Sequence, residues 1–235
     1  MGKGDRLGER LTIRAQDGHE LDAYKADPRG EVRGAVVVVQ EIFGVNSHIR
    51  SVADRLAAEG FAAIAPALFD RSERGVELRY GGVDRDRAFA FLHQLDPATA
   101  LLDVAAAGQT IAVGGQQPAV VGFCYGGLMS WLSATRGPAM GFEPACAVGY
   151  YAGGIGTYAS ERPSCPVMLH FGGADTHIGM DQVEAVRSEH PGVQVFVYEG
   201  AGHAFNRDVD PEAFHAEAAA LAWQRTVRFL RDHAG

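Results

Sequence analysis

A cysteine between two glycines is the residue of this chain best suited to act as a nucleophile. Residues 120–127 read VVGFCYGG, with Gly122 and Gly126 each two positions away from Cys124. An apolar run that passes directly into a helical pattern is typical of a nucleophile elbow, here with cysteine in place of the usual serine. Small neighbours let the helix approach the strand, and the N–H groups at the helix start favour a thiolate and can bind an oxyanion. Taken alone, the pattern also fits an ordinary packing cysteine.

An acidic residue and a histidine follow Cys124 in the order that such an elbow requires. The apolar run 166–171 leads into the sequence GGAD, which ends at Asp175, and the run 193–198 leads into a glycine-rich loop that ends at His203. Separately, these two residues would be interpreted as a turn residue and a surface histidine. Because the carboxyl ends of parallel strands meet at one edge of a sheet, their conjunction predicts a triad of Cys124, His203 and Asp175.

Strand and helix patterns alternate along most of the chain, which predicts the elements that position these residues. Expected strands are 10–14 and 20–26, joined as an antiparallel hairpin, and then 34–40, 61–65, 118–123, 145–150, 166–171 and 193–198. Expected helices are 46–59, 84–109, 125–135, 181–189 and 211–231. Such alternation predicts an α/β fold with a doubly wound, mostly parallel sheet and an N-terminal antiparallel hairpin. No repeat or long linker divides the sequence, so we expect one domain over residues 1–235.

The charge of the chain excludes several classes of partner. The formal net charge is -8, and Lys3 and Lys25 are its lysines, with no basic run. This composition disfavours binding to nucleic acid or to an anionic membrane surface. The apolar stretches are much shorter than the roughly 18 residues of a membrane span, and the first residues do not look like a secretory signal. We therefore expect a cytoplasmic protein whose partner is a small molecule.

The spacing of cysteines and histidines predicts neither a metal site nor a cofactor. Cys124, Cys146 and Cys165 are an odd number without metal-ligand spacing, and the histidines show no H-E-x-x-H pattern. Residues 41–46, after the first buried strand, lack the G-x-G-x-x-G turn of a nicotinamide enzyme. We interpret Cys146 and Cys165 as packing residues.

Several segments together make the chain resemble the dienelactone hydrolase family, the carboxymethylenebutenolidases. They are 40–44 (QEIFG), 122–127 (GFCYGG), 149–151 (GYY), 170–175 (HFGGAD) and 202–207 (GHAFNR). The resemblance extends over nearly the whole chain. It implies a small monomeric enzyme of the α/β-hydrolase fold.

The resemblance also assigns a role to each matching position of the catalytic centre. It implies that Cys124 is the nucleophile, His203 its base and Asp175 the group that orients the imidazole. The backbone N–H groups of Tyr125 and Ile42 would form the oxyanion hole, one from the elbow and one from the early strand-to-helix loop.

Three charged positions carry the implied activation of the thiol and the implied recognition of substrate. Glu41 matches a glutamate that contacts the resting thiol and helps to generate the thiolate, although a solvated strand-end carboxylate is the alternative. Arg207 matches an arginine that binds the substrate carboxylate, which suits the bidentate geometry of a guanidinium. A surface arginine is the alternative there. A second such arginine falls at Arg85, with Arg87 as its rival in a charge cluster at a helix start.

The resemblance and the departures from it outline the pocket. Phe43 and Tyr151 are expected pocket walls. Ala204 stands where a serine is often found, and Phe89 and Leu92 replace bulkier polar aromatics. The charged connection 70–87 could border the pocket, and the sequence leaves open whether it forms a lid.

The implied reaction is hydrolysis of a carboxylate-bearing enol lactone through a thioester. A thiolate suffices because the enolate is a good leaving group. The alternatives are a general esterase or thioesterase acting on neutral substrates, and a ligand-binding relative without turnover.

Overall fold

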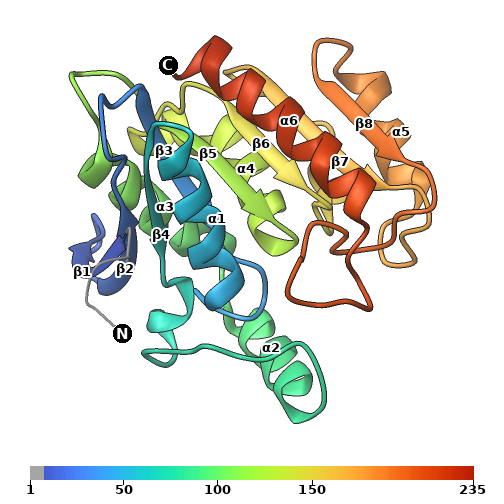
Figure 1. Ribbon diagram of the computed structural model, residues 1–235, viewed down its shortest axis with the longest axis horizontal. Helices are drawn as coiled ribbons and strands as arrows, with labels where there is room; N and C mark the ends of the chain where they lie inside the picture. Colours follow the sequence, from blue (N-terminus) through green and yellow to red (C-terminus); the bar gives the residue numbers. More distant parts are fainter. Residues whose placement is uncertain (1–7) are drawn as a thin grey trace.

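The computed structural model describes residues 8–235, and the eight strands of this part form one sheet (Figure 1). The strand order is β1-β2-β4-β3-β5-β6-β7-β8. β2 pairs antiparallel with both β1 and β4, and all other neighbours are parallel. The predicted hairpin and mostly parallel sheet are therefore confirmed. The strands are β1 Gly8–Arg14, β2 Glu20–Ala26, β3 Gly34–Val39, β4 Phe61–Pro66, β5 Ala119–Phe123, β6 Ala147–Tyr150, β7 Val167–Gly172 and β8 Gln194–Tyr198.

Helices cover both faces of the sheet. In Figure 1, α1 and α6 lie in front of it, whereas α3 and α4 pack behind it. Because both faces are covered, strands β3 to β7 are buried along their whole length and are made almost entirely of apolar residues. The helices are α1 Ser47–Ala58, α2 Val83–Gln94, α3 Pro97–Ile111, α4 Tyr125–Arg136, α5 Met180–Glu189 and α6 Ala216–His233, with short 3-10 helices η1 Leu68–Arg71, η2 Gly137–Met140 and η3 Ile155–Tyr158.

Two of the predicted helices differ from the structure. The expected helix 84–109 is broken into α2 and α3, because Pro97 lacks an N–H and disfavours helical backbone at the residue before it. Asp96 then caps α3 by accepting the N–H of Ala98 at 3.1 Å. The expected helix 211–231 begins only at Ala216, with His215 as its cap. The segment before it consists of turns that reach towards the site.

The carboxyl ends of the parallel strands place the predicted catalytic residues at one edge of the sheet. Cys124 follows β5, Asp175 lies in the loop after β7, and His203 lies in the loop after β8. The loop after β3 holds Glu41 and Ile42 at the same edge. Within the described residues, no helix is long and apolar enough to cross a membrane.

The segment between η1 and α2 is anchored to this edge. The N–H of Leu78 donates to the carbonyl of Phe43 at 2.9 Å, and Arg50 pairs with Glu77 at 2.6 Å. An isolated bridge joins Gly44 to Glu77. The anchoring brings the later part of the connection, including Tyr80, over the loop that follows β3.

Candidate active site

Cys124 occupies the sharp turn between β5 and α4. Its backbone has φ 54° and ψ -114°, a region that residues other than glycine rarely adopt. A Cβ atom at Gly122 would lie 1.9 Å from the carbonyl oxygen of Gly126, and one at Gly126 would lie 2.2 Å from that of Val39. Only glycines fit at these two positions, and they allow α4 to start directly against the end of β3. The elbow therefore holds Cys124 at the edge of the sheet.

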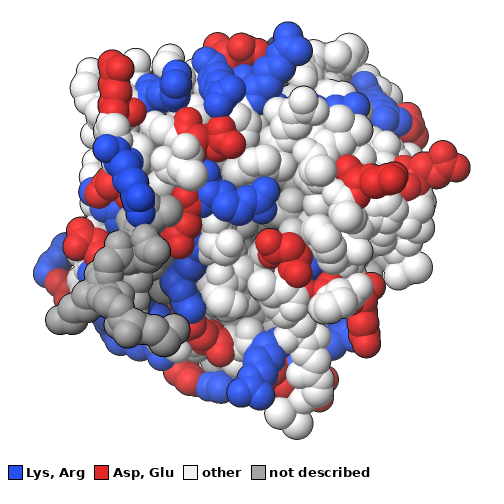
Figure 2. Space-filling view, in the orientation of Figure 1, with Lys and Arg blue, Asp and Glu red and all other residues white. Residues whose placement is uncertain are grey.

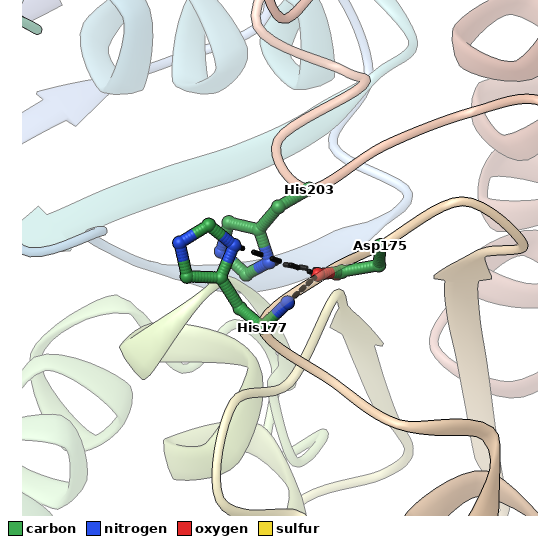
Figure 3. A group of neighbouring side chains, drawn as sticks. All are labelled: Asp175, His177 and His203. Atoms are coloured by element: carbon green, nitrogen blue, oxygen red, sulfur yellow. Dashed lines mark hydrogen bonds and ion pairs between the residues drawn. The ribbon is translucent and has the colours of Figure 1, made fainter.

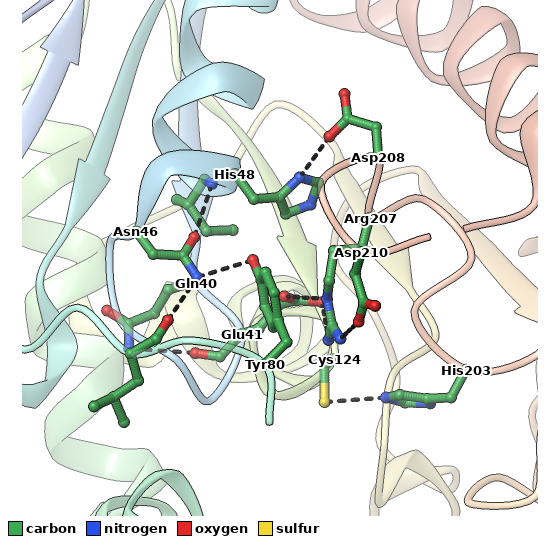
Figure 4. A network of polar contacts seen from close by, with 12 residues as sticks. Gln40, Glu41, Asn46, His48, Tyr80, Cys124, His203, Arg207, Asp208 and Asp210 are labelled. Atoms are coloured by element: carbon green, nitrogen blue, oxygen red, sulfur yellow. Dashed lines mark hydrogen bonds and ion pairs between the residues drawn. The ribbon is translucent and has the colours of Figure 1, made fainter. Parts of the chain in front are cut away.

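His203 and Asp175 make the contacts that a triad requires. His203 Nε2 lies 3.2 Å from Cys124 Sγ (Figure 4), and His203 Nδ1 lies 2.8 Å from Asp175 Oδ2 (Figure 3). The other oxygen of Asp175 accepts the N–H groups of His177 at 2.7 Å and Ile178 at 3.2 Å. These bonds fix the carboxylate, which in turn orients the imidazole towards the thiol.

Electrostatics favour the charged forms of the acid and the histidine. Burial by itself lowers the pKa of His203, but the hydrogen bonds to Asp175 and Cys124 and their charges outweigh it and raise the pKa to about 10. Burial raises the pKa of Asp175, yet the interactions with His203 and the two backbone N–H groups outweigh it and lower the pKa below its ordinary value. An imidazolium paired with a carboxylate is the state that these two shifts support.

Backbone strain is concentrated at this centre. Among the described residues, the non-glycine residues with positive φ are Cys124 at 54°, Tyr151 at 36° and Ala204 at 61°. Ala204 follows His203 directly, and the ring of Tyr151 lies 5.1 Å from the ring of His203. Such strain persists where the surrounding structure over-determines it, as is common at active sites. Ala204 is thus one of the positions at this centre where the backbone is strained.

The predicted oxyanion hole has N–H groups at both expected positions. Tyr125 is the first residue of α4, so its N–H has no partner within the helix. The N–H of Ile42 takes part in none of the hydrogen bonds found within residues 8–235. The close approach of Gly126 to Val39 brings these two segments together. Tyr125 follows Cys124 directly and Ile42 lines the same cleft as Cys124, so both N–H groups remain candidates for binding a developing oxyanion.

Glu41 and Arg207 form a buried pair with each other. Nε and Nη2 of Arg207 each donate to one carboxylate oxygen of Glu41 at 3.1 Å, and Nη1 donates to Asp210 at 3.0 Å. Burial alone would lower the pKa of Arg207, but the charge of Glu41 more than offsets this and raises it. The expectation that Glu41 contacts the resting thiol does not describe this structure, in which the thiol is turned towards His203 (Figure 4).

Sequence reasoning missed two residues that hold Arg207 in place. The guanidinium carbon lies 4.0 Å from the centre of the Tyr80 ring, and the Tyr80 hydroxyl accepts a bond from Asn46 at 2.8 Å. Asp210 stands three positions after Arg207, and this spacing of opposite charges is the signal that could have revealed it. Tyr80 is an aromatic residue in an otherwise charged, glycine-rich connection, which is a much weaker signal.

The thiol opens into a cleft of about 580 Å³. Ile42, Phe43 and Arg207 line it, as does Arg85 on α2. Its apolar wall is contributed by Leu92 and by two aromatic side chains that are each 38% exposed, Phe89 on α2 and Phe214 before α6. The cleft therefore offers an apolar wall beside a few charged groups, as small-molecule sites commonly do.

Of three residues considered for the pocket from the sequence, one lines the cleft and two do not. Arg85 lines the cleft, whereas Arg87 is paired with Glu73 and is not part of the lining. The structure thus favours Arg85 over its rival. Tyr151 does not line the cleft either, because its side chain is completely buried and packs beneath His203. The prediction of Tyr151 as a pocket wall is therefore wrong in this structure, and the residue supports the imidazole instead.

Comparison with known proteins agrees with this geometry. The sequence profile of the dienelactone hydrolase family matches residues 21–234. The chain belongs to this family. A carboxymethylenebutenolidase of Pseudomonas putida is 31% identical, over 95% of this chain and 96% of its own length. A Yersinia pestis protein provisionally named carboxymethylenebutenolidase is 33% identical, over 98% of this chain and 90% of its own.

Solved structures agree with the fold. A Klebsiella pneumoniae protein provisionally named dienelactone hydrolase superposes with a TM-score of 0.81 at 28% identity, covering 96% of this chain and all of its own. The protein described here thus has the α/β-hydrolase fold, and membership of this family makes it a carboxylic ester hydrolase.

Proposed function

We propose that this dienelactone hydrolase family member opens carboxylate-bearing enol lactones through a thioester on Cys124. The contact of Cys124 Sγ with His203 Nε2 at 3.2 Å, backed by Asp175, is the observation that carries the proposal. These contacts join a nucleophile to its base, and the base to the acid that orients it.

The reaction follows from these contacts in two steps. The thiolate attacks the ring carbonyl, the N–H groups of Ile42 and Tyr125 bind the resulting oxyanion, and its collapse breaks the ring C–O bond to release an enolate and leave a thioester. The enolate stays attached to the acyl chain and takes up the proton that the imidazolium of His203 gives up, which leaves His203 neutral for the second step. In the second step His203 removes a proton from water, whose oxygen attacks the thioester, and the proton returns to the sulfur of Cys124 as the acid leaves.

Formation of the thioester itself prepares His203 for the second step. Burial lowers the pKa of His203, and two of the interactions that raise it to about 10 come from Cys124. Those two interactions weaken when the sulfur becomes acylated, because a thioester carries no charge. The imidazole can then lose its proton near neutral pH and act as a base.

Arg207 and Arg85 are the candidates for binding the substrate carboxylate. A guanidinium has five N–H groups, and the observed bonds use two for Glu41 and one for Asp210, which leaves two for a substrate. Arg85 adds a cation from α2, where it lines the cleft beside the ring of Phe89. An anionic substrate would therefore lie between α2 and the loop that carries Arg207.

A neutral ester or thioester is the second candidate, and a specific observation favours it. Glu41 and Asp210 carry two negative charges against the single positive charge of Arg207, so this end of the cleft is not cationic by itself. An apolar substrate could instead rely on Phe43, Phe89 and Phe214.

Hydrolysis of a dienelactone and of a neutral aryl ester by wild type, Cys124→Ala and Arg207→Ala separates these candidates. We expect Cys124→Ala to lose both activities by at least about a thousandfold. We expect Arg207→Ala to lose the dienelactone activity selectively. Equal rates of Arg207→Ala and wild type on the dienelactone would favour the neutral substrates, and full activity of Cys124→Ala would overturn the mechanism.

We also propose that the protein acts as a cytoplasmic monomer without nucleic-acid or membrane partners. On the face shown in Figure 2, basic and acidic side chains are interspersed rather than gathered into one basic patch. In the part of the chain that the structure describes, large exposed apolar side chains are few, and two of them, Phe89 and Phe214, belong to the cleft. Light scattering of the purified protein at increasing concentration tests the monomeric state, and a constant dimer mass would contradict it.

A further inference from the structure

A second histidine lies beside the triad and takes no part in the proposed reaction. His177 Nδ1 lies 3.7 Å from Asp175 Oδ1, and its ring lies 5.0 Å from the ring of His203. Its side chain is 54% exposed and lines the cleft. In Figure 3 its ring lies in front of the ring of His203, with Asp175 to one side. His177 therefore faces solvent on one side and the catalytic acid and base on the other.

These three side chains have the composition of a transition-metal site. Within the described residues, Asp175, His177 and His203 are the one group whose candidate ligand atoms all lie within 4.8 Å of one another. Two imidazole nitrogens and one carboxylate oxygen are ligands that zinc and similar divalent ions prefer. Ligand atoms around such an ion stand roughly 3.3–3.5 Å apart. Separations of up to 4.8 Å must therefore shorten by up to about 1.5 Å, which rotation of the exposed His177 can provide, while His203 Nδ1 and Asp175 Oδ2, now 2.8 Å apart, must separate slightly.

We propose that a divalent transition-metal ion such as Zn²⁺ binds Asp175, His177 and His203 at the mouth of the cleft and reversibly inhibits the enzyme. The site is an inhibitory one, not a cofactor site, because its ligands include the acid and the base that the reaction needs. The inhibition rests on the proposed role of His203, whereas the binding does not.

The inhibition follows from the protons of His203. Nδ1 faces Asp175 and Nε2 faces Cys124 Sγ. A metal ion that binds Nδ1 releases the Nδ1 proton to solvent and leaves the remaining proton on Nε2. With Nε2 protonated and Nδ1 occupied, the imidazole can no longer accept a proton from the thiol or from water. The ion also takes Asp175 away from its orienting role.

A competing site must be distinguished from this one. Cys124 Sγ and His203 Nε2 are 3.2 Å apart and could themselves hold a soft metal ion. That alternative uses the thiolate and does not need His177. Binding to a protein without the thiol therefore separates the two arrangements.

Calorimetric titration with Zn²⁺ tests the proposal on wild type, Cys124→Ala, His177→Gln and His93→Gln. His93 is an exposed histidine on α2 outside the cleft lining, so its variant is the matched control. We expect one ion per chain in wild type and in Cys124→Ala, with affinity reduced at least about tenfold in His177→Gln and unchanged in His93→Gln. Equal affinity in His177→Gln and wild type would overturn the proposal, as would loss of binding in Cys124→Ala.

Two further measurements guard against the possibility that His177→Gln loses metal binding only because it is misfolded. The absorption spectrum of bound Co²⁺ should lack the charge-transfer band of a thiolate ligand, and the appearance of that band would contradict the assignment. Inhibition by Zn²⁺, expressed relative to each variant's own uninhibited rate, should require at least about ten times more metal in His177→Gln than in His93→Gln. Equal inhibition of these two variants would count against the site.

Discussion

The protonation of His203 depends on two neighbours that lie on different loops. Its pKa is lowered by burial but raised overall from an ordinary value of 6.5 to about 10 by Asp175 and Cys124. A histidine with a raised pKa stabilises the folded protein fully below pH 6.5, and this contribution is lost as the pH rises through about 10. Loss of the proton from His203 should therefore lower the stability of the folded protein across the neutral and mildly alkaline range.

Removing the thiol should expose the share of this shift that comes from Cys124. In Cys124→Ala we expect the pKa of His203 to fall below its wild-type value of about 10, because only Asp175 still raises it while burial still lowers it. Titration of the imidazole followed by NMR measures this directly. An unchanged pKa would mean that the thiol does not stabilise the imidazolium.

The pairing of Glu41 with Arg207 shows what the sequence could not reveal at the level of single residues. Both were identified as site residues, but they are 166 positions apart and nothing in either local pattern indicates that they contact each other. His177 was likewise overlooked, because its proximity to His203 is a property of the folded structure and no sequence motif indicates it. By contrast, Cys124 could be predicted because the glycines that its strained turn requires lie next to it in the sequence.

The elbow shows how elements position Cys124, the proposed nucleophile. Gly126 Cα approaches the end of β3 so closely that an added Cβ would lie 2.2 Å from a backbone oxygen of Val39, which cannot move aside easily. The close approach of Gly126 to β3 thus determines both how α4 packs on the sheet and how Cys124 is oriented.

Gly126→Ala should destabilise the protein by about 1–3 kcal/mol, the usual cost of overpacking. Gly192→Ala is the matched control, because a Cβ at Gly192 would meet nothing within 4 Å and its φ is not positive. The control should stay within about 0.5 kcal/mol of wild type. Urea unfolding measures both, and similar stabilities of the two variants would refute this account of the elbow.

The elements themselves were largely predictable, and the errors have identifiable causes. Strands β3 to β7 could be predicted from short apolar runs because both faces of the sheet are covered there, whereas alternating apolar and polar residues indicated the exposed hairpin of β1 and β2. The helical periodicity of residues 84–109 continues across the break, so it concealed the effect of Pro97. The turns that precede α6 were assigned to the helix because Pro211 fits a helix start equally well.

At the scale of the whole molecule, a buried ion pair ties three regions together. Arg71 of η1 donates to both oxygens of Asp103 on α3, at 2.7 and 2.8 Å, and to Asp17 in the β1–β2 turn at 2.8 Å. The side chain of Asp103 is fully buried. Burial raises the pKa of Asp103 even though the charge of Arg71 opposes this. The hairpin at the sheet edge is therefore held to the body of the fold partly by charge.

Arg71→Leu should destabilise the protein by about 3–5 kcal/mol, because it leaves a buried carboxylate without its partner. The double variant Arg71→Leu, Asp103→Leu should recover part of this loss. Arg228→Ala is the control, since the Arg228–Asp232 pair is exposed and 3.9 Å apart, and it should change stability by less than about 1 kcal/mol. Thermal melts compare the variants, and a double variant less stable than Arg71→Leu would contradict the explanation.

In the proposed mechanism, Cys124 carries the acyl group during turnover. Rapid acid quenching of the protein with an enol lactone or an activated ester, followed by mass spectrometry of the intact chain and its peptides, detects such an acyl group. We predict an adduct with the mass of the acyl group on the peptide that contains Cys124, absent in Cys124→Ala and accumulating in His203→Ala if acylation still occurs there. Turnover by wild type with no adduct on Cys124, or with an adduct on another residue, would contradict the mechanism.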